Sequence, residues 1–430
     1  MSRSRPPFWT PGARRARGRV DSLPREFALV AACVLLDDAA LRRTAPALLK
    51  APGFDWARLE ELAFYHEVEQ IVRMRLAEIA PGAVPGELAA RIQQALVRRT
   101  ALQAAQTAIA VRLTQALTRA GVPSLLLKGV GLSHMLYDPH PELRTSNDVD
   151  IAIAPEHIAA ADRAIRQEGL TRTSPVADPP PAARAMFLQM VNVYDYRGPI
   201  FNELVELHFR PTLNPYWMPV SFDDLLAATA EIETPQGTVR ALDGPLNVHY
   251  LCEHAIYNLI DFRLKWFGDI ARAVRRAGAD DCASYIARYP AALPPEPGRL
   301  ADEVLHTIAL GVEQAAAQSG AVRAGGEAAR IVRRMVRAQG IPVGRSLAQL
   351  PLELGLLWLV IRHLPGWRGK ARQMLLALAD PRDALTLRLG PRFAAVYWLA
   401  GPLLSLVRSV QRRREHPADA DAAVEARSFG

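Results

Sequence analysis

The chain has 430 residues, of which half are hydrophobic and 22% are charged, an ordinary globular composition that excludes a wholly disordered or fibrous protein. Its formal net charge of +8 is spread over many arginines, apart from basic clusters at residues 14–19 and 412–414; no aromatic platform accompanies these clusters, so nucleic-acid binding is not favoured. Three widely spaced cysteines imply no disulfide framework, and neither a signal-peptide pattern nor a run of roughly 18 apolar residues is present, so we expect a cytoplasmic protein without a transmembrane segment, with peripheral membrane contact left open.

The N-terminal part is predicted to be helical after a disordered start. Residues 1–22 are rich in Pro, Gly and Arg, which favours disorder. Apolar residues then recur at helical spacing through residues 23–119. The stretch from Pro85 to Ala120 has few breakers and predicts one amphipathic helix or two. We interpret His66 as a hydrogen-bonded helix histidine rather than a catalyst.

A strand, a glycine turn and a short helix come next. Leu125 to Leu127 form an apolar run that predicts a buried strand, and Gly129 stands where this strand gives way to a helix from Val130 to Tyr137. A helix N-terminus approached through glycine offers free backbone N–H groups and a partial positive charge. The segment is therefore a candidate phosphate site.

Two aspartates follow on the next apolar run. Side chains at positions i and i+2 of a strand share a face, so Asp148 and Asp150 converge while Val149, Ile151 and Ile153 form the opposite, buried set. Neighbouring carboxylates repel each other and need a cation, a shared proton or an arginine. Oxygen ligands alone favour Mg²⁺ or Mn²⁺. The alternative is a solvated loop or edge strand, because a bare D-x-D is short and common.

The chain then alternates between helix and strand. A helix from Pro155 is expected to end at Gly169, and residues 174–184 form a loop that could gate the site. A hairpin around Gly198 leads into LVELHFR, residues 204–210, where apolar and polar residues alternate.

Taken together, these motifs resemble those of a known superfamily. A strand, a glycine at a helix start, a helix, a loop and a D-x-D on the following strand are similar to the polymerase-β-type nucleotidyltransferases. LLLKG, the following ML-Y and R-x-x-N-D-x-D-I-x-I resemble the bacterial nucleotidyltransferase family proteins. The resemblance covers the core and, more loosely, its flanking helices. It implies an α+β fold with a small mixed β-sheet core flanked by N-terminal and C-terminal helical regions.

The resemblance also implies the residues of an active site. Such folds usually add a third carboxylate from a later strand, here Glu206, to complete a site with Asp148 and Asp150 for Mg²⁺ or Mn²⁺. Phosphate would lie against a second set of residues: Lys128, Gly129, Val130, Ser133 and Arg144. The superfamily commonly has Gly-Ser at the turn, whereas this chain has Gly-Val with Ser133 as the nearest hydroxyl in sequence. The alternatives are a surface acid on a half-exposed strand for Glu206, an ordinary lysine at a strand end for Lys128 and a surface loop arginine for Arg144.

The implied activity is transfer of a nucleoside monophosphate from an NTP to an unidentified hydroxyl or phosphate acceptor, with release of pyrophosphate. The acceptor could be a small molecule or a peptide or protein hydroxyl. The alternative is a catalytically inactive nucleotide-binding or scaffolding protein of a biosynthetic assembly. Modification of a nucleic acid would need a continuous basic groove.

The C-terminal part is again predicted to be helical. LKWFGDI, residues 264–270, matches a pattern of the family. His249, Cys252 and His254 do not share one helix face, so a zinc site is disfavoured. Trp217 is interpreted separately, as a packing residue. The apolar segment 393–407 favours a core helix over a partner-binding or interfacial one. The expected boundaries are a disordered segment 1–22, a helical region 23–119, a nucleotidyltransferase core 120–240, a helical region 241–410 and a disordered tail 411–430.

Overall fold

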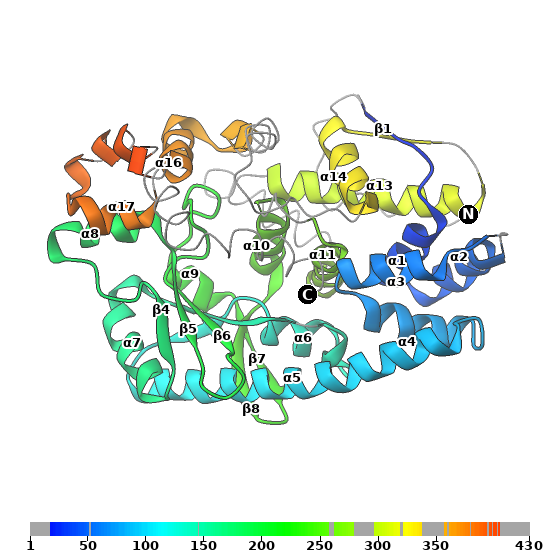
Figure 1. The fold of residues 1–430 in the computed structure, drawn as a ribbon, viewed down its shortest axis with the longest axis horizontal. Helices are drawn as coiled ribbons and strands as arrows, with labels where there is room; N and C mark the ends of the chain where they lie inside the picture. The colour runs from blue at the N-terminus through cyan, green and yellow to red at the C-terminus, as the bar shows by residue number, and fades with distance from the viewer. Residues whose placement is uncertain are drawn as a thin grey trace, which may run out of the picture.

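The computed structural model describes residues 18–50, 53–144, 146–257, 262–278, 296–318, 321–337, 357–358, 361–378, 380–393, 395–397, 399–401 and 403–404. Its centre is a seven-stranded sheet with the order β4-β5-β6-β3-β2-β8-β7 (Figure 1). The strands are β2 (Ser124–Leu126), β3 (Asp148–Ile153), β4 (Thr171–Ser174), β5 (Val193–Arg197), β6 (Leu204–His208), β7 (Thr229–Thr234) and β8 (Gly237–Leu242). The pairs β3–β6 and β2–β8 are parallel and the others are antiparallel, which confirms the mixed sheet of an α+β fold.

One face of this sheet is covered by long helices. The helix α5 (Gly86–Arg119) is a single helix, which settles the alternative of one helix or two, and it packs on β2, β3 and β8 together with α7 (Ile158–Gln167). The predicted inward set of β3 is buried here, since Val149, Ile151 and Ile153 are each about 1% exposed or less. Asp148 and Asp150 therefore lie on the opposite face.

That opposite face is covered by α9 (Phe222–Ala227) and α10 (Gly244–Tyr257). Leu125, Leu127 and Ala152 of the sheet pack there against Leu225 and Tyr250. The aspartates lie at the end of this apolar contact, where β3 begins. Short α6 (Val130–Leu136) connects β2 to the loop before β3.

The two flanking helical regions share one hydrophobic core. In Figure 1 they form a body beside the sheet. Its N-terminal helices are α1 (Arg25–Leu35), α2 (Asp38–Lys50), α3 (Trp56–Tyr65) and α4 (Glu69–Ile79). Its C-terminal helices are α11 (Leu264–Ala277), α13 (Glu296–Ala316) and α14 (Gly326–Arg337). Because α1 packs on α11 and α13, the helical regions before and after the sheet stabilise each other.

Part of the segment predicted to be disordered is ordered. β1 (Gly18–Val20) pairs antiparallel with β9 (Val322–Ala324), so the prediction for residues 1–22 is wrong at 18–20. The partner strand lies some 300 residues away and supplies hydrogen bonds that no local pattern reveals. Residues 1–17 and 411–430 lie outside the described part of the chain.

The histidine and tryptophan interpretations hold. His66 is fully buried; its Nε2–H donates to the Met335 carbonyl at 3.0 Å and its Nδ1 accepts from the Leu264 N–H at 3.1 Å. Trp217 is 3% exposed in the helical core, and its carbonyl accepts from His249 at 3.4 Å. Both histidines thus serve packing and hydrogen bonding.

The apolar C-terminal segment is only partly buried. It follows α8 (Pro181–Met190), α16 (Gly366–Leu378) and α17 (Pro381–Leu387), which lie together at one end of the molecule (Figure 1). Tyr397 is buried, but Leu399 and Leu403 are 83% and 63% exposed, so the preference for a core helix is wrong at these two positions. Within the described residues no helix is long and apolar enough to cross a membrane.

Candidate active site

The glycine turn brings the backbone against the aspartates. Gly129 has φ +64° and ψ −121°, a backbone conformation that residues other than glycine rarely adopt. A Cβ on Gly129 would lie 3.2 Å from the Asp148 carbonyl oxygen, 3.2 Å from Ser146 Oγ and 3.6 Å from Asp150 Oδ2. The absence of a side chain therefore keeps the space beside the carboxylates open.

The strand register places the third predicted carboxylate beside the aspartates. In the parallel β3–β6 pair, Asp150 lies directly opposite Glu206, and Asp148 lies opposite Leu204. Asp150 is fully buried, whereas the side chains of Asp148 and Glu206 are each 24% exposed. The result is one buried acid flanked by two that solvent reaches.

Lys128 is the first counter-charge. Its Nζ lies 2.7 Å from Asp150 Oδ1 and 3.5 Å from Asp148 Oδ2. Burial opposes the ammonium form, but the charges of Asp150 and Asp148 outweigh burial and raise the pKa of Lys128 above its ordinary value. Burial likewise favours protonated Asp150, but Lys128 and then His208 hold the pKa of that carboxyl below its usual range.

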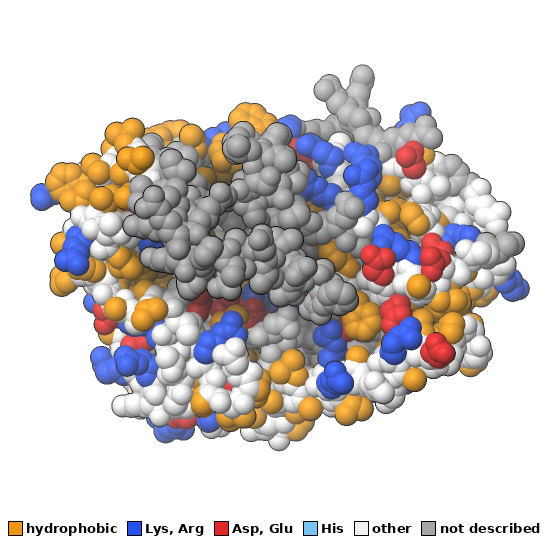
Figure 2. Space-filling model, viewed as in Figure 1, with side chains coloured by type: hydrophobic (Ala, Val, Ile, Leu, Met, Phe, Trp, Pro, Cys, Tyr) orange, Lys and Arg blue, Asp and Glu red, His pale blue; other side chains and the backbone are white. Residues whose placement is uncertain are grey.

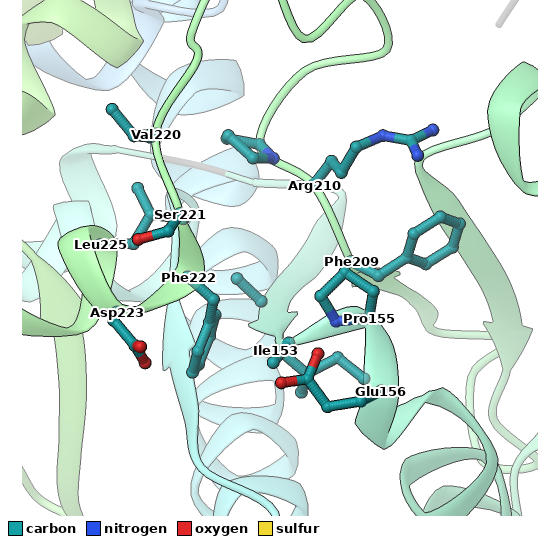
Figure 3. A pocket seen from close by; sticks show the side chains of 13 residues that line it. Ile153, Pro155, Glu156, Phe209, Arg210, Val220, Ser221, Phe222, Asp223 and Leu225 are labelled. Atoms are coloured by element: carbon teal, nitrogen blue, oxygen red, sulfur yellow. The ribbon is translucent and has the colours of Figure 1, made fainter.

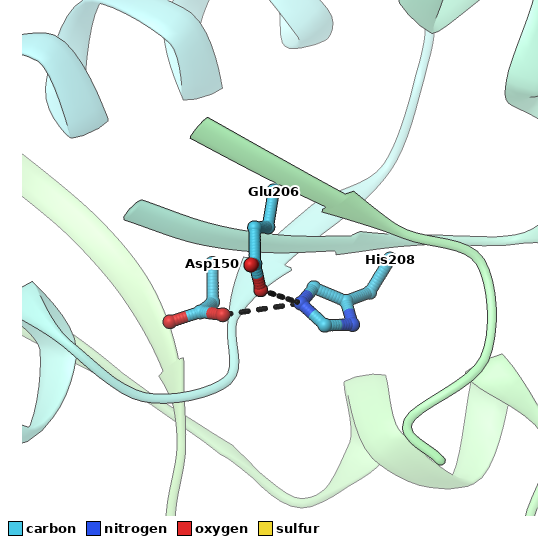
Figure 4. A group of neighbouring side chains, drawn as sticks. All are labelled: Asp150, Glu206 and His208. Atoms are coloured by element: carbon cyan, nitrogen blue, oxygen red, sulfur yellow. Dashed lines mark hydrogen bonds and ion pairs between the residues drawn. The ribbon is translucent and has the colours of Figure 1, made fainter. Parts of the chain in front are cut away.

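His208 is the second counter-charge, and the sequence analysis did not assign it to the site. Its Nε2 lies 3.1 Å from Asp150 Oδ1 and 3.2 Å from Glu206 Oε2, so one N–H is shared between two carboxylates (Figure 4). Burial disfavours the imidazolium, yet these hydrogen bonds and charges raise the pKa of His208 to about 9. The sequence spacing does indicate His208, because it follows Glu206 by two residues and so shares the same face of the strand.

Asp195 is a fourth acid on the same face that the sequence analysis missed. In the antiparallel β5–β6 pair it lies directly opposite Glu206. Its Oδ1 is buried and accepts no hydrogen bond from the described residues. Burial, followed by the charge of Glu206, raises the pKa of Asp195. The alternation in VYDYR carries the signal, since Tyr194 and Tyr196 are buried on the other face.

Two residues predicted to contact phosphate have other partners. Ser133 is fully buried; its hydroxyl donates to the Val130 carbonyl and accepts from Gln103. The hydroxyl that contacts a site carboxylate belongs to Ser146, which donates to Asp148 Oδ1 at 2.8 Å. Arg144 is not a surface arginine: it is 4% exposed and pairs with Asp269.

A cavity of about 280 Å³ opens where β3 and β6 end (Figure 3). It begins at Ala152, two residues after Asp150 on the same strand face, and continues through Phe209 directly after His208. Its wall is mainly apolar, and Glu156 supplies a carboxylate to it. The residues that line it are Ala152, Ile153, Ala154, Pro155, Glu156, Phe209, Arg210, Pro211, Val220, Ser221, Phe222, Asp223 and Leu225.

No described cation is directed into this cavity. Arg210 is part of its wall, but its side chain extends away from the other lining residues in Figure 3 and donates to the carbonyls of Leu188, at 2.7 Å, and Val191. Among the described lining residues, the charged groups that remain are Glu156 and Asp223. The 174–184 loop contributes none of the lining, so its gating role stays a prediction.

The described residues visible in Figure 2 form no continuous basic groove. There, Lys and Arg side chains of the described residues gather over α14 and are elsewhere interspersed with acidic and hydrophobic ones. This distribution does not favour nucleic acid as a ligand of that face.

The acidic cluster fits a divalent cation. Ligand atoms of Asp150, Glu206 and His208 all lie within 4.8 Å of one another. Asp150 Oδ2 is buried and has no hydrogen-bond partner among the described residues, an arrangement that costs free energy unless a cation uses it. The nitrogen of His208 departs from the oxygen-only set that we expected and suits Mn²⁺ or another transition metal better than Mg²⁺.

A mixed sheet that places clustered carboxylates beside a glycine turn is the arrangement that the sequence resemblance implies for an enzyme that transfers nucleotidyl groups. The family model described as "Uncharacterised nucleotidyltransferase" matches residues 52–292, more than half of the chain, and the protein belongs to this family. No curated protein and no solved structure matches the chain.

Proposed function

We propose that the protein is a metal-dependent nucleotidyltransferase that moves a nucleoside monophosphate from an NTP to a hydroxyl or phosphate acceptor and releases pyrophosphate. The cluster of Asp150, Glu206 and His208 beside the Gly129 turn carries this proposal, since it unites cation ligands with an open backbone surface. Asp148 completes the donor set from the same strand face.

Asp148, Asp150 and Glu206 would hold Mn²⁺ or Mg²⁺, and His208 would join them on giving up its Nε2 proton to solvent. When bound, such an ion neutralises phosphate charge and polarises the phosphoryl oxygens. Lys128 and His208 neutralise the carboxylates through ion pairs. The folded chain therefore tolerates the acidic cluster when no ligand is bound. An ammonium released from Asp150 would then be available to phosphate oxygens.

The cavity at the end of β3 and β6 is where we place the acceptor. It opens where β3 and β6 end, and its lining residue Phe209 follows Glu206 along the chain after Leu207 and His208. Asp195 lies opposite Glu206 on β5, and burial raises its pKa, which makes it a stronger base than an ordinary carboxylate for the proton of an incoming hydroxyl.

An inactive nucleotide-binding or scaffolding protein is the second candidate. The observation that favours it is the internal pairing of the site: Lys128 and His208 satisfy the acids without a metal, so the acidic cluster alone does not demand turnover. The unpartnered Oδ2 of Asp150 argues against it, because burial of an unused carboxylate oxygen is costly.

The decisive experiment follows label from each NTP. Wild-type protein is incubated with α-labelled ATP, GTP, CTP or UTP, Mn²⁺ or Mg²⁺, and a small-molecule and protein extract, beside Asp148→Ala/Asp150→Ala. Glu87→Ala is the matched control, since it removes an exposed acid of the first turn of α5. Labelled product and pyrophosphate from wild type and the control, but not from the double variant, support the proposal. Equal behaviour of all three proteins contradicts it.

A further inference from the structure

We propose that Asp269 of α11 is a positioning residue: through Arg144 it holds the Gly129 turn in the shape that the active site requires. The importance of that shape rests on the proposed function, whereas the clamp itself can be tested without it. Neither residue touches the carboxylate cluster directly in the described contacts.

We call the buried Arg144–Asp269 ion pair, together with its hydrogen bond to Gly129, the clamp. Its guanidinium donates both to the Asp269 carboxylate and to the Gly129 carbonyl. Arg144 Nε and Nη2 donate to Asp269 Oδ2 at 3.2 and 3.0 Å, and Arg144 Nη1 donates to the Gly129 carbonyl at 3.2 Å. Arg144 is 4% and Asp269 1% exposed. The planar, multiply donating guanidinium serves the carboxylate and the carbonyl at once, in a fixed geometry.

The far end of α6 is tied to the same carboxylate. Tyr137, which directly follows the helix, donates its hydroxyl to Asp269 Oδ1 at 2.8 Å. The guanidinium of Arg272, one turn after Asp269 on α11, lies over the Tyr137 ring at 4.4 Å. Both ends of α6 are therefore fixed to α11, and the turn before it cannot shift without breaking charged hydrogen bonds.

Fold stability alone is a weak reason for a buried ion pair. A buried ion pair is often replaceable by apolar residues of similar volume at little cost, because desolvation offsets the attraction. What apolar residues cannot replace is the donor to the Gly129 carbonyl. The carbonyl also accepts from the Ser133 N–H at 3.1 Å, so Arg144 adds a second bond that fixes its direction.

A second ion pair on α11 provides the matched control. Lys265, four residues before Asp269, pairs with Glu67 at the junction of α3 and α4, and Arg263 pairs with the same carboxylate. Lys265→Met removes a buried charge from the same helix while leaving Glu67 with Arg263. It perturbs α11 and acts on Arg144 and Asp269 only through the charge that it removes, not through any described hydrogen bond of either residue.

The test uses Arg144→Met/Asp269→Leu, which removes both charges together and so leaves neither one buried alone. Tyr137→Phe is the milder variant, which keeps the ion pair and loses one hydrogen bond. The first readout is amide hydrogen exchange of the peptide covering residues 128–137 in the full-length protein without ligand. We expect exchange about tenfold faster or more in the double variant, less in Tyr137→Phe and unchanged in Lys265→Met.

The second readout is binding of a non-hydrolysable NTP analogue with Mn²⁺ by calorimetry. We expect about tenfold weaker analogue binding in the double variant, with Mn²⁺ affinity within about twofold of wild type. Unchanged protection of the turn, or equal loss in Lys265→Met, overturns the clamp. Faster exchange together with an analogue that fails to bind wild type leaves the clamp standing and counts against the proposed function alone.

Discussion

Replacing Lys128 with methionine is the most direct test of how the site balances its charges. The ammonium lies 2.7 Å from Asp150 Oδ1, and Asp150 is fully buried. Methionine keeps the apolar stem and removes the charge. Removing one partner of a buried pair costs about 3–5 kcal/mol. We expect about 3 kcal/mol, the lower end, because His208 remains 3.1 Å from the same carboxylate.

A divalent cation should reverse this loss. A ligand that binds only the native state adds about 2.7 kcal/mol at a concentration 100 times its Kd. In wild type the ammonium already neutralises the same carboxylate and its charge repels the cation, so Mn²⁺ should stabilise the variant more than the wild type. The assay is urea unfolding followed by circular dichroism at pH 7.5, with and without MnCl₂.

Two further variants serve as controls. Lys128→Arg keeps the charge and should stay close to wild type, and Lys50→Met makes the same substitution at the exposed end of α2. If Mn²⁺ stabilises wild type and Lys128→Met equally, or if Lys128→Met unfolds no earlier than Lys50→Met, then Lys128 is not the counter-charge of Asp150 in solution.

Three other outcomes are expected. Asp195→Asn should weaken Mn²⁺ binding in calorimetry less than Glu206→Gln does, since Asp195 lies one strand further from Asp150; an equal or larger effect would make it a primary ligand. Gly129→Ala should lower the free energy of unfolding in urea by about 1–3 kcal/mol, because alanine is strained at φ +64° and its Cβ would lie 3.2 Å from Ser146 Oγ. Gly121 also has a positive φ but open space around it, so Gly121→Ala measures the contribution of backbone strain alone. Burial lowers the pKa of His66 to about 3 from 6.5, so the unfolded chain takes up the extra proton between these values and stability falls as the pH drops below 6.5. From pH 7.5 to 5 this loss is about 2 kcal/mol, and a urea midpoint equally pH-dependent in His66→Gln would refute the assignment.

Local patterns in the sequence predict the parts of the site that one or two neighbouring elements determine. The i, i+2 spacing of Asp148 and Asp150 and the alternation around Glu206 depend only on strand geometry, and the structure shows both. Asp195 and His208 obey the same alternation and were missed because the resemblance directed attention to three acids. Their membership follows once the hairpin pairs Asp195 with Glu206.

Other parts depend on contacts between distant segments, which no local pattern contains. Arg144 carries the same charge whether it meets phosphate or Asp269, and only the packing of α11, 125 residues later, decides between them. Ser133 likewise has a hydroxyl close to the turn in sequence, but the helix geometry directs it to the Val130 carbonyl and Gln103. The sequence therefore gives the chemical group, whereas the contact that the group makes depends on the fold.

The extent of the family match has a physical explanation in these distant contacts. The sheet ends at Leu242, yet the match begins at residue 52, before α3, and continues to residue 292, beyond α11. α11 is the element that joins these parts: Lys265 reaches Glu67 in the N-terminal helices, and Asp269 reaches Arg144 beside the turn. A fragment restricted to the sheet would leave Arg144 as a buried cation without its partner and the Gly129 carbonyl without a fixed donor. The unit that shapes the candidate active site thus includes helices from both sides of the core.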